Sequence, residues 1–176
     1  PDYALVPREQ IDAFITGVKD TFQNFYHGKV EGNEDYTSIV NERHHQRILL
    51  LLEDARTKGA RVIACAPLGK GRQMPLHIVT DLNKDMLLMQ EEIFGPVLPI
   101  VAYDKIDEAL TFINERPRPL ALYCFSHDAE ERSTILKNTH SGGVSINDWG
   151  WHVVNHDAPF GGIGNSGMGN YHGLEG

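Results

Sequence analysis

Short hydrophobic runs alternate along this chain with longer segments in which apolar residues recur every three or four positions. Runs rich in β-branched or aromatic residues predict strands at Asp2–Val6, Arg61–Ala66, Leu76–Thr80, Val97–Tyr103, Leu120–Phe125 and Val144–Ile146. Helix-spaced apolar residues predict helices at Ile11–Tyr26, Asn41–Ala55, Ile106–Ile113 and Asp128–Leu136. This alternation indicates an α/β fold, with a largely parallel sheet flanked by helices that bury both of its faces.

A few residues predict where the first two helices lie and how they face. Asn41 is a favoured N-cap residue, and Gly59 predicts the end of the helix that Asn41 opens. The apolar spacing of the first helix places Phe25 on its inward face. We expect His44 and His45 to lie on a solvated polar face of the second helix.

Composition excludes several classes of protein. The net charge is −8, from 16 Lys and Arg against 24 Asp and Glu, and no basic run occurs, so we expect no nucleic-acid partner. The longest apolar run, Ile48–Leu52, is too short to cross a bilayer. Cys65 and Cys124 are too few for a disulfide scaffold and lie in apolar runs, which predicts buried free thiols in a cytoplasmic protein. The 176 residues suffice for one compact domain.

Two segments carry polar residues next to predicted strands. Glu91 and Glu92 precede the strand at Val97–Tyr103, either as a solvated acidic turn or as a carboxylate held where it can accept hydrogen bonds from sugar hydroxyls. Asn147 follows the strand at Val144–Ile146, either as a turn residue or at a ligand site, because ligands of α/β sheets bind at the carboxyl ends of strands.

Two apparent motifs do not support the sites that they suggest. Gly162, Gly164 and Gly167 have the spacing G-x-G-x-x-G, but no helix is predicted after them, and the chain ends before the acidic residue of a dinucleotide fingerprint could occur. His152 and His156 could bind a metal, but a helix between them is doubtful and no third ligand pattern recurs. We therefore expect these glycines either to let the backbone approach a substrate or to make tight turns, and we expect no metal.

Together, these segments resemble the aldehyde dehydrogenase superfamily. Glu91–Val97 looks like its motif Glu-Glu-Ile-Phe-Gly-Pro-Val. Further matches run in the family's order through Phe112–Arg116, Leu120–Tyr123, Ser141–Val144, Asn147–Asp148 and Pro159–Tyr171. The run through Tyr171-His172-Gly173 is most similar to the class-3-like branch and, within it, to bacterial coniferyl aldehyde dehydrogenases.

The resemblance implies a role for particular residues. Glu92 looks like the glutamate that hydrogen-bonds the nicotinamide ribose, and Phe94 looks like the aromatic residue that packs beside the nicotinamide. The residues expected to hold the active site or to line its substrate tunnel are Asn147, Val153, Val154, Phe160 and His172. Such an aromatic and aliphatic tunnel suits an apolar or aryl aldehyde.

The resemblance also implies that residues 1–176 are the C-terminal, catalytic-domain portion of a longer enzyme, and the chain begins with Pro1 rather than Met. The nucleophilic cysteine in Gly-Gln-x-Cys, the general-base glutamate and the Rossmann-like cofactor domain would lie upstream, so we expect this chain alone to be inactive. The whole enzyme would be a homodimer that oxidises an aldehyde to a carboxylic acid with NAD or NADP, through a cysteine thiohemiacetal.

Three alternatives stay open. A non-catalytic binding or scaffold module could keep the fold without the reaction. A member of the same superfamily could instead reduce acyl phosphates or acyl-CoA, although the run through Tyr171-His172-Gly173 favours oxidation of simple aldehydes. A metal-dependent hydrolase built on His152 and His156 is the third.

Overall fold

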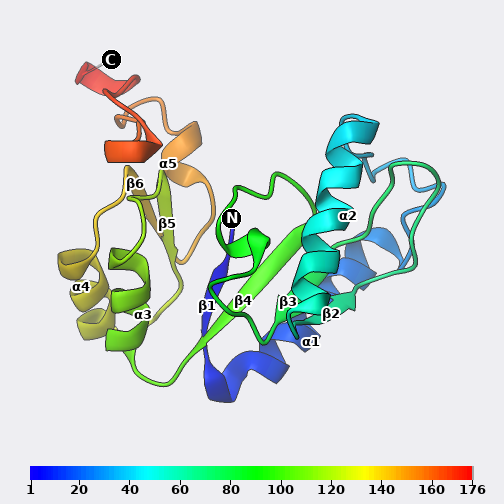
Figure 1. Cartoon of the computed structure of the whole chain (residues 1–176). Coiled ribbons are helices and arrows are strands. Elements are labelled where there is room, and N and C mark those ends of the chain that lie inside the picture. Colours follow the sequence, from blue (N-terminus) through cyan, green and yellow to red (C-terminus); the bar gives the residue numbers. More distant parts are fainter. Residues whose placement is uncertain (176) are drawn as a thin grey trace. The chain divides into compact units, whose positions relative to one another are not determined.

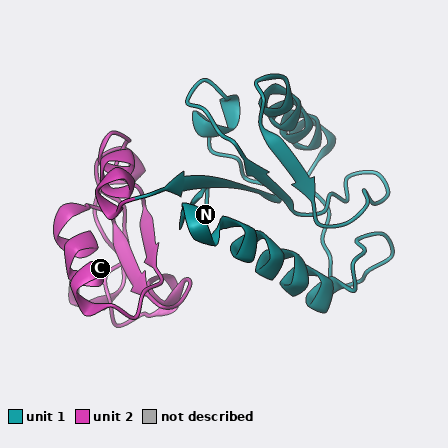
Figure 2. Cartoon of the chain, turned by 90° about the horizontal axis from the view of Figure 1, so that it is seen from below, with its two compact units in different colours: residues 1–104 teal, residues 105–176 magenta. Residues whose placement is uncertain are grey.

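The computed structural model describes residues 1–175 and divides the chain into two compact units. The first unit comprises residues 1–104, and the second begins at Lys105 (Figure 2). This differs from the single compact domain that the length allows. The reason is that each unit pairs its own strands: four named strands form one sheet in unit 1, and two form another in unit 2.

Unit 1 is built on a sheet with the strand order β1, β4, β3, β2 (Figure 1). Its strands are β1 (Ala4–Pro7), β2 (Arg61–Ala64), β3 (His77–Thr80) and β4 (Val97–Tyr103). β4 pairs in parallel with both β1 and β3, whereas β2 pairs antiparallel with β3. The predicted largely parallel sheet is confirmed, with β2 as an antiparallel edge strand.

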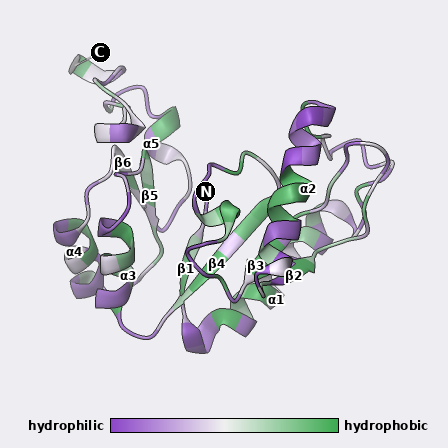
Figure 3. Cartoon of the chain, in the orientation of Figure 1, coloured by the Kyte–Doolittle hydropathy of each residue, from purple (hydrophilic) through white to green (hydrophobic). Residues whose placement is uncertain are grey.

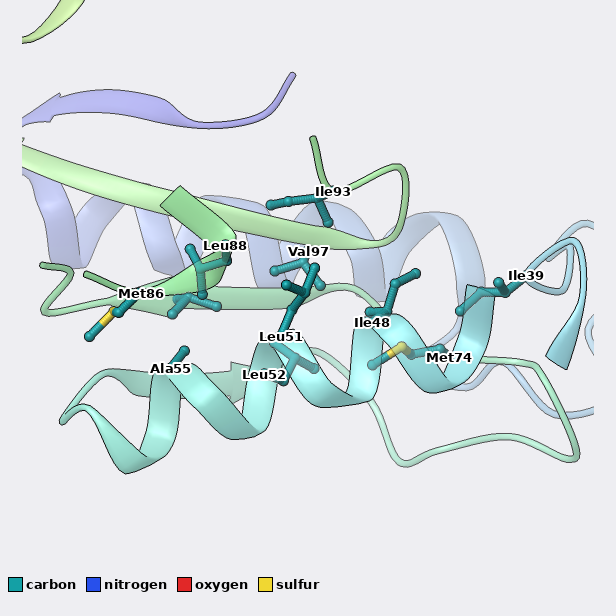
Figure 4. Packing of buried hydrophobic residues seen from close by; sticks show 11 residues of the cluster. Ile39, Ile48, Leu51, Leu52, Ala55, Met74, Met86, Leu88, Ile93 and Val97 are labelled. Atoms are coloured by element: carbon teal, nitrogen blue, oxygen red, sulfur yellow. The ribbon is translucent and has the colours of Figure 1, made fainter. Parts of the chain in front are cut away.

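Two helices cover opposite faces of this sheet: α1 (Ile11–Tyr26) and α2 (Glu42–Thr57). Adjacent residues of a strand point to opposite faces, and Ile78 packs in a cluster with Ile15 of α1, whereas Val79 packs in a cluster with Ile48 of α2. Figure 4 shows the α2 side chains directed at the sheet. Both faces are therefore buried, which explains why every residue of β3 is buried and why most of β4 is hydrophobic (Figure 3).

The ends of α2 agree with the sequence. The Asn41 side chain accepts a hydrogen bond from the His44 backbone N–H at 2.8 Å, and Gly59 has a φ of +95° just past the helix. The prediction that His45 is solvated is wrong: only 9% of it is exposed, because it belongs to the buried stripe that continues at Ile48 three residues later.

The inward orientation predicted for Phe25 is also wrong. Phe25 is 68% exposed, and the buried residues of α1 are Ile15 and Phe22. Tyr26, at the end of α1, contacts Tyr36 of the following loop, and the centroids of their rings lie 4.7 Å apart.

Unit 2 contains the parallel pair β5 (Ala121–Cys124) and β6 (Gly143–Ile146), with helices α3 (Ile106–Asn114), α4 (Ala129–Asn138) and α5 (Trp151–Val154). Asp128 caps α4 by accepting hydrogen bonds from the backbone of Glu130 and Glu131. The Asn114 amide donates to the Asn138 carbonyl at 2.8 Å and so ties the ends of α3 and α4. Beyond α5, the described chain forms loops and single 3₁₀ turns at Gly164–Ser166 and Gly173–Glu175.

Both cysteines are free thiols. Cys124 is buried as expected, but Cys65 is only half-buried. Burial raises the pKa of both thiols, so neither is set up as a thiolate. Within residues 1–175, no helix combines the length and the apolar character that crossing a membrane requires.

Candidate functional site

The turn at residues 91–96 leads into β4 and separates one buried side chain from two exposed ones. Ile93 is 2% exposed and packs in the core cluster beneath α2 (Figure 4). On either side of it, the Glu92 carboxylate is exposed and the Phe94 residue is 74% exposed. Because Ile93 anchors the turn in the core, its neighbours are directed outward.

The helix α2 holds the backbone of this turn. The Arg47 guanidinium donates to the Glu92 carbonyl at 2.9 Å and to the Ile93 carbonyl at 2.5 Å. His44 Nε2 lies 2.7 Å from the Phe94 carbonyl, and since a carbonyl only accepts, Nε2 carries the proton. Three successive carbonyls are thus bound by one helix.

Two backbone features show that the conformation of the turn is specified. Phe94 has a φ of +52°, a left-handed conformation that costs a residue with a Cβ about 1–2 kcal/mol. Gly95 lies so close to α2 that an added Cβ would be 2.2 Å from Cδ1 of Ile48, which is itself fully buried. The turn therefore keeps a strained shape against α2.

The exposed groups of the turn fit a ligand with both hydroxyls and a flat ring. Among the described residues, the Glu92 side chain has no hydrogen-bond partner, so its oxygens are available to accept bonds from outside. The ring of Phe94, two residues along, offers an apolar face. An exposed carboxylate without an internal partner is compatible with both interpretations of Glu92, as a solvated acidic turn and as an acceptor for sugar hydroxyls.

Asn147 has an internal role in unit 2. It has a φ of +53°, which Asn tolerates better than most residues. Its side chain accepts from the Ser126 backbone N–H at 2.8 Å and donates to the Ser126 carbonyl at 3.0 Å. Both hydrogen bonds tie the segments that follow β5 and β6, so Asn147 acts here as a structural turn residue at the carboxyl ends of the strands.

His152 forms a contact that the sequence did not predict. Its Nδ1 lies 2.8 Å from the hydroxyl oxygen of buried Ser145, and its ring lies beside the rings of Tyr123 and Phe160 at 5.6 and 5.9 Å. Burial lowers the pKa of His152, which favours the neutral ring. Gly143 admits this ring, because an added Cβ would lie 2.6 Å from it. The short helix α5 carries His152 but ends at Val154, so it does not run through both His152 and His156, the helix that the sequence made doubtful.

Phe160 and His172 lie close together through an antiparallel bridge. The backbones of Phe160 and Tyr171 exchange hydrogen bonds of 2.7 and 2.9 Å, and their rings meet at 5.5 Å. His172 Nε2 lies 3.1 Å from His156 Nδ1. Thus His156 pairs with His172 and His152 with Ser145; within residues 1–175, no group of three potential metal ligands occurs.

The remaining predicted residues lie on α5 and in the glycine-rich loop. Val153 and Val154 are exposed on α5, at 37% and 61%. Gly162 makes a close backbone turn, since an added Cβ would lie 2.2 Å from the Ser166 carbonyl. The predicted tight turns at the glycines are confirmed. Glu92 and Phe94 belong to unit 1, and the other predicted site residues belong to unit 2.

Comparison with known proteins identifies the family. The sequence profile described as "Aldehyde dehydrogenase family" matches residues 2–176. The chain belongs to the aldehyde dehydrogenase family. A probable coniferyl aldehyde dehydrogenase of Pseudomonas aeruginosa is 46% identical over 176 residues, covering 100% of this chain and 37% of the relative. The rat aldehyde dehydrogenase family 3 member A2 is 42% identical over 174 residues, covering 98% and 35%.

A solved structure confirms the fold. The indole-3-acetaldehyde dehydrogenase of P. syringae, a mutant in complex with NAD⁺ and IAA, matches with a TM-score of 0.85 at 25% identity, covering 99% of this chain and 36% of that one. This chain spans little more than a third of the length of these relatives. These values say how much of each relative the chain covers, and not which part of the relative it matches. The C-terminal position that the resemblance implies therefore stays a prediction.

Proposed function

We propose that this chain is a catalytic-domain portion of an NAD(P)-dependent aldehyde dehydrogenase that oxidises an apolar or aryl aldehyde to its carboxylic acid. The observation that carries the proposal is the turn at residues 91–96. It presents a free carboxylate and an aromatic ring from a backbone that α2 fixes. A bound NAD(P)⁺ would supply the acceptor for the hydride that the aldehyde carbon gives up.

In this proposal, the residues of unit 1 bind and orient the cofactor. The Glu92 carboxylate accepts hydrogen bonds from the two ribose hydroxyls next to the nicotinamide. The Phe94 ring packs beside the nicotinamide and limits its positions. Since an error of about 1 Å in the placement of reacting atoms can cost roughly a hundredfold in rate, orientation by these two side chains matters for hydride transfer.

The residues of unit 2 form the site of the aldehyde. Asn147 holds the ends of β5 and β6. The apolar side chains of Val153, Val154 and Phe160, with His172, contact the organic part of the substrate and exclude water. The ring-to-ring contacts of Phe160 with His152 and Tyr171 make this region aromatic, which supports an aryl substrate.

The relatives support the same substrate class. The Pseudomonas aeruginosa relative bears the name of coniferyl aldehyde, an aryl aldehyde, and the P. syringae structure that of an indole acetaldehyde. We propose coniferyl aldehyde as the first substrate to test. We also propose a cytoplasmic homodimer, which size-exclusion chromatography with light scattering of the whole enzyme would check.

The test is a hybrid enzyme in which the 176 residues of this chain replace the matched segment of the Pseudomonas aeruginosa relative. NAD(P)H formation from coniferyl aldehyde is compared for the hybrid, the unmodified relative and this chain alone. We expect activity in the hybrid and in the relative, and none in the chain alone. A folded, soluble hybrid that is inactive beside an active relative would contradict the proposal and favour a non-catalytic scaffold module.

A further inference from the structure

Three residues on one face of α2 contact the turn at residues 91–96. His44, Arg47 and Ile48 are spaced by three and four residues, which places them side by side on a helix. His44 and Arg47 bind three successive carbonyl oxygens of the turn, and Ile48 closes the space beneath Gly95. One helix therefore binds three carbonyls of the turn, while the Asp2 carboxylate accepts from the Ile93 backbone N–H at 3.5 Å and the His77 N–H donates to the Pro96 carbonyl at 2.8 Å.

Arg47 is itself oriented by the turn. Its Nη1 lies 3.2 Å from a carboxylate oxygen of Glu91, while Nη2 donates to the carbonyls of Glu92 and Ile93. A planar guanidinium can bind these acceptors at once, which a lysine ammonium on a flexible stem cannot do with the same geometry. Hydrogen bonds from a charged donor are stronger than neutral ones, so these contacts outweigh ordinary turn bonds.

The turn needs such restraint because its backbone is strained. Phe94 keeps a φ of +52° although it is not glycine. With the carbonyls of Glu92, Ile93 and Phe94 released, the backbone would relax toward ordinary φ values. Rotation at Phe94 would then redirect its own ring and the neighbouring Glu92 carboxylate.

We propose that Arg47 and His44 are positioning residues of the dehydrogenase reaction, acting on the carbonyls of the turn to aim Glu92 and Phe94 at the cofactor. Neither residue needs to touch the reacting atoms. The catalytic part of this inference rests on the proposed function, whereas the restraint of the turn does not. The two parts are therefore tested separately.

The first experiment uses this full chain and requires no activity. Amide hydrogen exchange at residues 91–97 is measured in Arg47→Met and in the matched control Arg43→Met. Arg43 lies on the same helix and is exposed, and it forms no hydrogen bond or ion pair with the described residues of the turn. We expect exchange to accelerate by about tenfold or more in Arg47→Met and to stay unchanged in Arg43→Met. Equal exchange in both variants would overturn the restraint.

The second experiment places the same variants in the hybrid enzyme. We expect Arg47→Met to slow single-turnover hydride transfer by roughly ten- to a hundredfold, to raise the KM for the cofactor and to increase the deuterium isotope effect on kcat. Arg47→Lys should recover part of the rate, and Arg43→Met should match the parent. A fall in kcat with unchanged isotope effect and cofactor KM would show only lost folded enzyme and would overturn the positioning role.

The two experiments separate this inference from the proposed function. An inactive unmodified hybrid counts against the proposed function and, with it, the catalytic part of the inference. The exchange result on the chain alone still decides whether Arg47 holds the turn. An active hybrid that Arg47→Met leaves unchanged overturns the positioning role alone. His44→Leu, which removes the bond to the Phe94 carbonyl, should show the same changes to a smaller degree, since a single hydrogen bond is lost.

Discussion

The turn at residues 91–96 in unit 1 and the loop that follows α5 in unit 2 are held in different ways. The turn is held from outside, by Arg47 and His44 of α2, a helix with one buried face. The loop is held from within, by the bridge between Phe160 and Tyr171 and by close backbone packing at glycines such as Gly162.

This difference decides which side chains stay available. In the turn, the backbone takes up the internal hydrogen bonds and leaves the Glu92 carboxylate and the Phe94 ring free. In unit 2, the polar side chains Asn147 and His152 are themselves used for internal bonds. Under the proposed function, unit 1 supplies polar recognition of a ligand, and unit 2 supplies shape and an apolar surface.

The largest effect on this comparison should come from removing the support beneath the turn. Ile48→Ala leaves a cavity at a fully buried position that packs against Gly95, and we expect it to lower the free energy of unfolding by about 2–5 kcal/mol. Leu50→Ala, on the exposed side of the same helix, should change it by less than about 0.5 kcal/mol. Urea denaturation followed by far-UV circular dichroism measures both, and equal effects would contradict the anchoring of the turn on α2.

In unit 2, the corresponding test disturbs the close backbone packing of the loop that follows α5. Gly162→Ala places a Cβ against the Ser166 carbonyl, and we expect it to destabilise the unit by about 1–3 kcal/mol. Tryptophan fluorescence reports on this unit, because both tryptophans, Trp149 and Trp151, lie there. The same substitution at Gly17, where α1 leaves open space, should instead stabilise unit 1 by about 0.5–1 kcal/mol. A harmless Gly162→Ala would show that the loop is not held by its backbone.

A smaller difference in stability should separate the two contributions of Asn147, which are its side-chain hydrogen bonds and its left-handed φ. Asn147→Ala loses two hydrogen bonds and keeps a left-handed φ, and we expect it to cost about 1–3 kcal/mol in unfolding free energy. Asn147→Gly loses the same bonds but adopts that φ without strain, so it should cost less than alanine. The comparison uses tryptophan fluorescence in urea, and a glycine variant as unstable as alanine would rule out backbone strain at this position.

The smallest effect concerns pH and acts in the same direction in both units. Burial chiefly lowers the pKa of His77 in unit 1 and of His152 in unit 2. As the pH falls below about 6.5, the unfolded chain therefore binds more protons than the folded chain. The stability that is present above that pH is progressively lost as the pH falls further. Unfolding free energies at several pH values should show this slope. His77→Leu should reduce this slope in unit 1.

The sequence predicted those features that depend on neighbouring residues. Apolar spacing located α2 and β4 within a few residues, and the Asn41 cap follows from local chemistry. The outward-facing pair Glu92 and Phe94 came from a resemblance to a family motif. Sequence spacing also placed the glycine-rich turn near Gly162 correctly.

The contacts that give the site its geometry could not be predicted in this way. Arg47 binds a carbonyl 45 residues further along the chain, and no local pattern marks that pairing. The contact of His152 with Ser145 depends on the space that Gly143 leaves. The sequence predicted a solvated His45 because histidine is polar, yet its position on the buried stripe of α2 places it in the core. Only the tertiary structure defines these roles.

The most direct test of the account is hydride transfer in the hybrid enzyme with Glu92→Gln. This change keeps the size of the side chain but removes the charge that would bind the ribose hydroxyls, and Glu34→Gln, at another exposed glutamate of unit 1, is the matched control. The account predicts that single-turnover hydride transfer slows by roughly ten- to a hundredfold in Glu92→Gln, while the enzyme still forms its covalent adduct with the aldehyde, and that the control equals the parent. An unchanged rate of hydride transfer in Glu92→Gln would contradict it.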